Sequence, residues 1–136
     1  MALNNKNINN YFYVFLITHL IIWTVIPTVT NNNLPLDTIE ALAWGSNLDW
    51  GFNKHPPMSA VMVEIFYKIF GSNDWAYYFL SQVCLIICFF VIYNFSSYLF
   101  SKKIFSLISV LLLEGIYFYN YTSPEFNVYV AEIPFW

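Results

Sequence analysis

The chain has 136 residues, of which 59% are hydrophobic, 22% aromatic and only 10% charged. Soluble domains usually contain about 25% charged residues, so this composition leaves too few charges to cover a water-exposed surface. The formal net charge is −3 and no basic patch is present, which excludes a nucleic-acid-binding protein. The composition therefore predicts an integral membrane protein.

Three apolar segments are candidates for membrane-spanning helices, at residues 11–29, 75–100 and 104–121. The first has no charged side chain, and at about 1.5 Å per residue it nearly crosses a hydrocarbon core of about 30 Å. It also exceeds the roughly 7–15 apolar residues of a cleaved signal peptide, so we expect it to stay as a span. Residues 126–136 look like the start of a further helix. The sequence predicts one all-α polytopic unit, with about three spans and the beginning of a fourth.

A loop at residues 30–74 connects the first two spans, and its most polar part is residues 34–57. Residues 37–44 have the pattern of a short helix. Asp37 can cap that helix, and Glu40 three residues later completes a capping box.

The second half of the same loop contains an apolar helix at residues 58–70. Thirteen residues are too few to cross a membrane, so we expect this helix to lie in the membrane interface. Glu64 and Lys68 are spaced for an ion pair on one helical face, which we expect to point towards water.

The lysines predict the orientation of the chain. Positive residues favour the cytoplasmic side, so Lys6 and the pair Lys102 and Lys103 should share that side. Two crossings between them satisfy this requirement, whereas counting residues 58–70 as a span would not. The loop at residues 30–74 is therefore expected to be external.

Asp37 and Glu40 lie on one face of the predicted short helix, just outside the bilayer. A carboxylate there can act as a general base or contribute to a metal site. The structural alternative is equally simple, because an N-cap and its capping-box partner require the same two residues.

Lys54 and His55 precede two prolines that stiffen the backbone. The two cationic side chains can bind an anionic headgroup or a phosphate, or the segment can simply be a rigid turn. A divalent metal bound by Asp37, Asp49 and His55 is conceivable, although no fixed ligand spacing supports it.

Glu114 lies about ten residues into the third apolar segment. A carboxylate at that depth is costly, so we expect it to face inward and to pair with another helix. His19, within the first span, is expected to be a packed histidine rather than a ligand. Cys84 and Cys88 share a helical face and are expected to be packing residues, without a disulfide.

A resemblance to a known family is carried by the stretch at residues 34–71, LPLDTIEALAWGSNLDWGFNKHPPMSAVMVEIFYKIFG. It resembles the first external loop of bacterial GT-C membrane glycosyltransferases, which are related to dolichyl-phosphate-mannose protein mannosyltransferases and to the aminoarabinose transferases of lipid A. The later stretches LLLEGIYFYNYTSPEFN and PFW also resemble this family. The resemblance implies a protein of the bacterial inner membrane.

The resemblance also implies a reaction and its residues. These enzymes transfer a sugar from a polyprenyl-phosphate donor to a lipid, glycan or protein acceptor on the outer side of the membrane. The position that matches the family's catalytic base is Asp37. Lys54 and His55 match the family's K-H-P-P motif and are expected near the donor phosphate, and Glu40 is a further substrate-binding candidate.

The chain departs from the family pattern in length, because full enzymes of this kind have about a dozen spans. The resemblance therefore implies the amino-terminal portion of a split or truncated enzyme, with the remaining part as a partner. The alternative is a non-catalytic small membrane protein or the remnant of a split gene.

Overall fold

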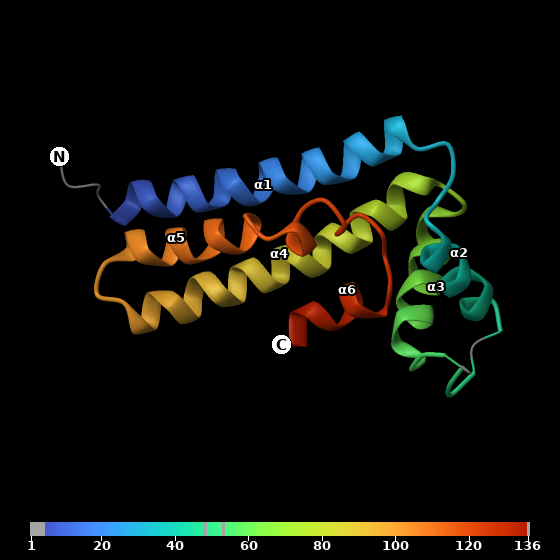
Figure 1. The fold of residues 1–136 in the computed structure, drawn as a ribbon. Helices are drawn as coiled ribbons and strands as arrows, with labels where there is room; N and C mark the ends of the chain where they lie inside the picture. The colour runs from blue at the N-terminus through green and yellow to red at the C-terminus, as the bar shows by residue number, and fades with distance from the viewer. Residues whose placement is uncertain (1–4, 48, 53, 136) are drawn as a thin grey trace.

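The computed structural model describes residues 5–47, 49–52 and 54–135, and this part of the chain is helical without a β-strand. Two long antiparallel helices, α1 and α4, form the body of the molecule, and α5 lies beside them (Figure 1). Two shorter helices, α2 and α3, gather at one end of this bundle. The bounds are Asn5–Thr30 for α1, Leu36–Gly45 for α2, Met58–Phe70 for α3, Asp74–Leu99 for α4, Lys103–Glu114 for α5 and Val128–Glu132 for α6.

The helices α1 and α4 are each 26 residues long, with mean hydropathies of 1.9 and 2.0 over their most apolar windows. At about 1.5 Å per residue, each is about 39 Å long, which exceeds the hydrocarbon thickness of a bilayer. Both are thus long and apolar enough to cross a membrane, as predicted for residues 11–29 and 75–100. α4 is the central helix, because 56% of its apolar window is buried compared with 28% for α1.

Side chains tie the start of α1 to the turn between α4 and α5. The ring of Phe12 stacks on Tyr93 with centroids 3.8 Å apart. Tyr93 donates a hydrogen bond of 2.8 Å to Asn9 Oδ1, and Lys103 Nζ lies 3.2 Å from the same oxygen. The N-terminal end of α1 and the Lys102–Lys103 turn therefore lie at the same end of the bundle, as two crossings between them require (Figure 1).

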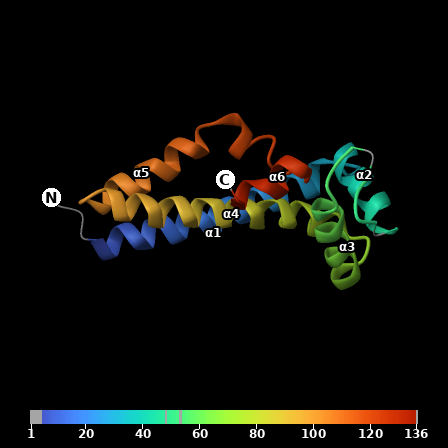
Figure 2. The same ribbon diagram turned by 90° about the horizontal axis from the view of Figure 1, so that it is seen from below.

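The third span predicted at residues 104–121, with Glu114 interrupting it, is not confirmed, because the helix there stops at Glu114. α5 has only 12 residues, so it is about 18 Å long and too short to span by itself. Its last residue is Glu114, and a 3-10 turn, Tyr117–Tyr119, follows after Gly115. Asn120 donates its side-chain amide to the Glu114 carbonyl oxygen, which replaces the next helical hydrogen bond. In Figure 2, α5 moves away from α4 and the chain then returns towards it.

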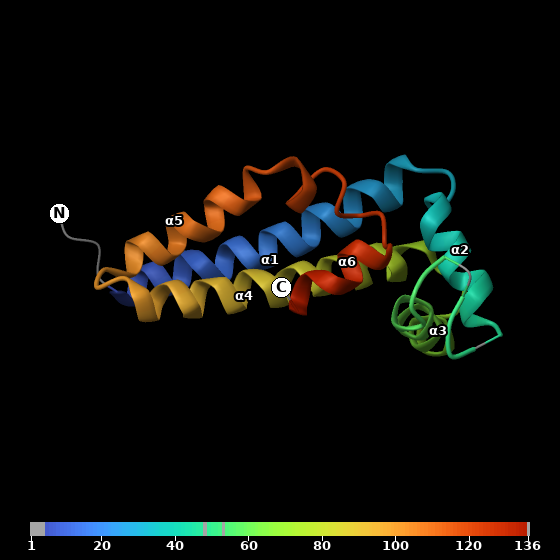
Figure 3. The ribbon, with the colours of Figure 1, turned by 60° about the horizontal axis from the view of Figure 1, so that its bottom comes forward.

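The helix predicted at residues 58–70 has those bounds in α3. It ends at Gly71, whose φ of 68° is the left-handed conformation that glycine adopts readily. The Glu64 carboxylate lies 3.3 Å from Lys68 Nζ, which confirms the expected ion pair. Only Lys68 is well exposed, since the Glu64 side chain retains 14% of its accessible surface. α3 lies crosswise to α4 at the end of the bundle (Figure 3), and its placement along a membrane surface stays a prediction.

The last helical segment packs back onto α4 rather than leaving the bundle. Asn127 accepts a hydrogen bond from the Val130 amide at 3.0 Å and so caps the start of α6. Val130 and Ile133 are buried in the main core. The helix expected to begin within residues 126–136 is therefore present as α6 and a following 3-10 turn, Ile133–Phe135, while Trp136 lies outside the described residues.

Candidate functional site

A small cavity at the α2–α3 end of the bundle brings together three of the four candidate site residues from the sequence, Asp37, Glu40 and His55. Its volume is about 10 Å³, which is room for about one water molecule. We call this the loop-end site, and its lining consists of Asp37, Glu40, Ala41, Trp44, His55, Ser59, Asn127 and Val128. The site therefore joins α2, the start of α3 and the chain just before α6.

Asp37 lies in the first turn of α2, but it is not the N-cap. Pro35 occupies the N-cap position, and its carbonyl oxygen accepts the amide hydrogen of Ile39 at 3.1 Å. The predicted capping box is therefore wrong, because the proline starts the helix two residues earlier than Asp37 would. The structure shows no hydrogen bond to the Asp37 carboxylate from the residues that it describes. This carboxylate is half-buried and borders the cavity, so it remains able to accept a proton or a hydrogen bond.

Glu40 is engaged by Lys54. The ammonium of Lys54 lies 2.9 Å and 3.2 Å from the two carboxylate oxygens of Glu40. The hydrogen bond from Lys54 to Glu40, together with the negative charges of Glu40 and Asp37, raises the pKa of the lysine. The ammonium is thus a permanent cation at physiological pH, and it is held within the electrostatic range of Asp37.

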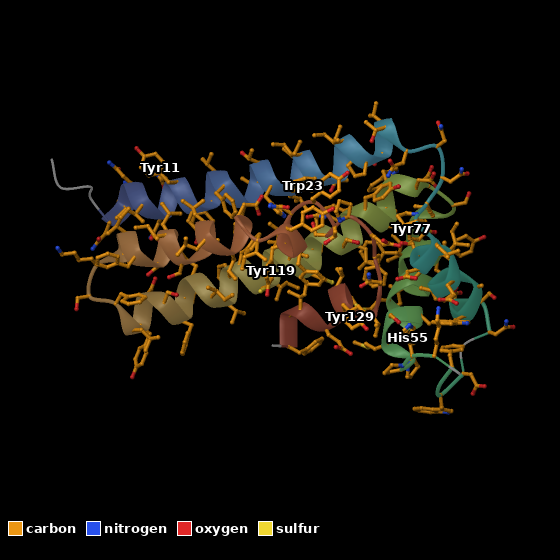
Figure 4. The ribbon with its side chains drawn as sticks, viewed as in Figure 1. Tyr11, Trp23, His55, Tyr77, Tyr119 and Tyr129 are labelled. Carbon is orange, nitrogen blue, oxygen red and sulfur yellow. The ribbon has the colours of Figure 1, made fainter. Side chains whose placement is uncertain are left out.

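His55 is fixed by aromatic packing. Trp44 of α2 stacks on Phe52 with centroids 5.3 Å apart, and the edge of His55 faces the same indole at 5.6 Å. Figure 4 places His55 at this end of the molecule, beside α3. The imidazole is half-buried and borders the cavity together with Asp37.

Two lining residues, Ser59 and Asn127, were missed as site residues in the sequence. Asn127 reaches the site because Thr38 of α2 donates a hydrogen bond of 3.0 Å to the Phe126 carbonyl oxygen. This contact joins positions 88 residues apart, so no local pattern predicts it. The sequence contains only indirect information about Asn127, because an asparagine directly before an apolar helix is a common N-cap.

The close approach of α2 to α3 depends on Gly45. A Cβ atom at this position would lie 2.9 Å from the Ala60 carbonyl oxygen and 3.1 Å from Glu64 Cβ. Backbone atoms cannot move aside as a flexible side chain can. The absence of a side chain therefore sets the distance between the two helices that hold the loop-end site.

We expect Gly45→Ala to destabilise the packing of α2 on α3 by about 1–3 kcal/mol, because overpacking forces the backbone apart. Thermal unfolding in detergent would measure this loss. Gly51→Ala is the matched control, since nothing lies within 4 Å of a Cβ at Gly51 and its φ is not positive. Equal stability of the two variants would contradict the proposed contact.

A second polar cluster lies inside the bundle, away from the loop-end site. His19 Nδ1 of α1 is 2.9 Å from Glu114 Oε2 of α5, and His19 Nε2 is 2.9 Å from Gln82 Oε1 of α4. The other oxygen of Glu114 accepts a long contact of 3.5 Å from the indole nitrogen of Trp23, which Figure 4 labels. The inward, helix-pairing orientation predicted for Glu114 is therefore confirmed.

The described residues contain no group of three His, Cys, Asp or Glu side chains able to hold a metal ion. Asp49, one member of the conceivable ligand set, is exposed and accepts a hydrogen bond from the following amide of Trp50. The three-ligand set with Asp37 and His55 is therefore not assembled. Cys84 and Cys88 are free thiols buried in α4.

A larger hollow of about 330 Å³ lies near the same end of the bundle. It is separate from the loop-end site and is bounded by the end of α1, the start of α4 and residues 121–125. Its polar lining includes Asn31, whose amide donates a hydrogen bond of 3.1 Å to the Tyr78 hydroxyl, and Glu125.

The two long apolar helices are those of an integral membrane protein, and the loop-end site lies at one end of the bundle that they form. The family described as dolichyl-phosphate-mannose-protein mannosyltransferase matches residues 54–136, which is more than half of the chain. The chain therefore belongs to this family of GT-C glycosyltransferases, as the sequence resemblance implied. The match begins at Lys54, so Asp37 and Glu40 precede it. No curated protein and no solved structure was found to match the chain.

Proposed function

We propose that the chain contributes the loop-end part of a glycosyltransferase that uses a polyprenyl-phosphate-linked sugar donor on the outer side of the bacterial inner membrane. The family membership supports the glycosyl-transfer chemistry and the class of donor. The single observation that carries the residue roles is the shared cavity of Asp37, Glu40, His55 and Asn127.

In this proposal, Asp37 is the general base. As the acceptor hydroxyl or amine attacks the anomeric carbon, Asp37 takes its proton, and the bond from that carbon to the phosphate oxygen breaks. The polyprenyl phosphate leaves with the bonding electron pair, and the configuration at the anomeric carbon inverts. The absence of hydrogen-bond donors on Asp37 among the described residues favours this role, because an unengaged carboxylate is free to accept a proton.

Lys54 and His55 are proposed to bind the donor phosphate. Lys54 is a fixed cation whose side chain is 60% exposed, so it can reach a lipid headgroup at the membrane surface. Glu40 then contributes to substrate binding by holding the ammonium in place until a phosphate competes for it. Proximity supplies much of the rate gain in such a transfer, so this positioning is chemically valuable.

The cavity of about 10 Å³ is too small for a sugar or a lipid phosphate. We therefore propose that the donor and acceptor pockets are completed by further spans, supplied by the partner portion of the enzyme. In this proposal a divalent metal would be bound only by Asp37 and His55, which border the same cavity.

Transfer of a sugar from a polyprenyl-phosphate donor tests this function. Membranes containing these 136 residues alone and membranes that also contain the remaining spans of the enzyme would be compared. Transfer that requires both parts is the expected result. Abundant, correctly inserted protein without transfer in either membrane would favour the non-catalytic alternative.

The outer position of the loop-end site has its own test. In a background without Cys84 and Cys88, single cysteines at Ser46 and Ser101, both exposed, report the side of the membrane. An impermeant thiol reagent is expected to label position 46 in intact cells and position 101 only after the membrane is opened. The reverse pattern would overturn the orientation.

A further inference from the structure

The buried cluster around His19 has hydrogen bonds whose directions can be assigned one after another. The Ser123 hydroxyl donates its only hydrogen to the Asn120 carbonyl oxygen at 2.7 Å. The same oxygen can then only accept, and it accepts from Gln82 Nε2 at 3.3 Å. This fixes the orientation of the Gln82 amide, so its oxygen faces His19.

The amide orientation determines the protonation of the histidine ring. Because Gln82 Oε1 lies 2.9 Å from His19 Nε2, that nitrogen must carry a hydrogen. The other nitrogen, Nδ1, lies 2.9 Å from Glu114 Oε2. A bare nitrogen beside a carboxylate oxygen would place two lone pairs against each other in a buried site. One further proton must therefore sit between the two side chains.

The surroundings favour placing this proton on the histidine. The imidazole faces two acceptor oxygens, Gln82 Oε1 and Glu114 Oε2. The carboxylate in turn faces two donors, the imidazole and the Trp23 indole.

His19 Nδ1 and Glu114 Oε2 are both buried and lie 2.9 Å apart, but they are not aligned as a hydrogen bond. Of the described side chains in these contacts from α1, α4 and α5, only His19 and Glu114 are ionisable as acid or base partners. The proton is therefore held by this pair and by no third charge within the cluster.

We propose that His19 and Glu114 form a proton-binding site inside the membrane-spanning bundle, with His19 held as an imidazolium. This site ties α1 to the end of α5 and, through Gln82 and Ser123, to the segment at residues 116–124. That segment continues directly into Asn127 of the loop-end site, and Ser81 holds it to α4 through a hydrogen bond of 3.1 Å to the Pro124 carbonyl oxygen. The contact between His19 and Glu114 thus helps to fix the path by which the chain returns to the loop-end site. The proposal does not depend on sugar transfer.

Nitrogen NMR of the full chain in detergent micelles, with ¹⁵N in the histidine rings, tests the protonation directly. The chain has two histidines, so the His19 signals are those lost in His19→Gln. We expect both ring nitrogens of His19 to carry protons, because each lies 2.9 Å from an acceptor oxygen. An unprotonated Nδ1 in the unaltered chain would overturn the proposal.

Glu114→Gln provides the matched comparison, because its amide can donate to Nδ1 and keep the geometry without a negative charge. His19 is expected to become neutral in this variant, with a bare Nδ1. Glu132→Gln removes a carboxylate of α6 that takes no part in the hydrogen bonds of this cluster, and it should leave the His19 signals unchanged. A protonated Nδ1 in Glu114→Gln would show that the Glu114 carboxylate is not what keeps the proton on His19. That result would also overturn the proposal.

Amide hydrogen exchange at one fixed pH tests the anchoring of residues 116–124. We expect exchange at least about tenfold faster in Glu114→Ala, because this segment opens more often once its tie is lost. Exchange in Glu114→Gln should stay close to that of the unaltered chain. Equal rates in Glu114→Ala and the unaltered chain would show that the pair does not anchor the segment.

Discussion

Asp37→Asn is expected to lower sugar transfer by about 10²–10⁴-fold, which is the usual contribution of a general base. An amide has nearly the shape of a carboxylate but cannot accept the acceptor's proton. The structure sharpens this test, because Pro35 and not Asp37 is the N-cap of α2. Asp37 retains only a favourable position in the first turn of the helix, worth about 0.3–1 kcal/mol. If Asp37 had only a structural role, both Asp37→Asn and Asp37→Ala would leave the rate of sugar transfer nearly unchanged.

The assay measures transfer from a polyprenyl-phosphate donor in membranes that contain the complete set of spans, at matched protein levels. Asp49→Asn is the control, since Asp49 is an exposed acid of the same loop that lies outside the lining of the site. Loss in Asp37→Asn and Asp37→Ala with full activity in Asp49→Asn is the expected pattern. Near-normal transfer by Asp37→Asn would remove Asp37 from the reaction.

Glu114→Ala is expected to cost about 3–5 kcal/mol of stability, because it leaves the buried His19 without its charge partner. The His19 side chain is 1% exposed, so water cannot replace the lost carboxylate. Adding His19→Ala should recover part of the loss, since the second substitution removes the group that was left unpaired. Unfolding by denaturant in mixed micelles would measure both variants.

The exposed ion pair of the loop-end site supplies the comparison. Lys54 and Glu40 approach each other as closely as His19 and Glu114, at 2.9 Å, and the two carboxylate side chains are similarly exposed, at 32% and 26%. The difference lies in the basic partner, because the Lys54 side chain is 60% exposed and the His19 side chain only 1%. Glu40→Ala should therefore cost only about 0–1 kcal/mol. Similar losses in Glu40→Ala and Glu114→Ala would contradict the assignment of the inner pair as a buried, charge-matched contact.

Several features followed from the sequence because their causes are local. Composition and two uncharged apolar runs indicated a helical membrane protein, since few charges cannot cover a soluble surface. The bounds of α3 were predictable because Pro57 precedes it and Gly71 can adopt the left-handed conformation that ends it. The K-H-P-P segment identified the family, and the family match begins at its lysine.

The tertiary structure alone decided the remaining features, because they depend on residues far apart in the chain. Hydropathy could not show that α5 stops at Glu114, where the carboxylate turns to His19, 95 positions earlier in the sequence. The capping box was predicted wrongly because both Asp37 and Pro35 can start a helix. Only the folded loop selects Pro35. Asn127 joins Asp37 at the loop-end site through the Thr38–Phe126 hydrogen bond. Local patterns report the pairing of neighbours, whereas the partners of buried polar groups are chosen by the packing of whole helices.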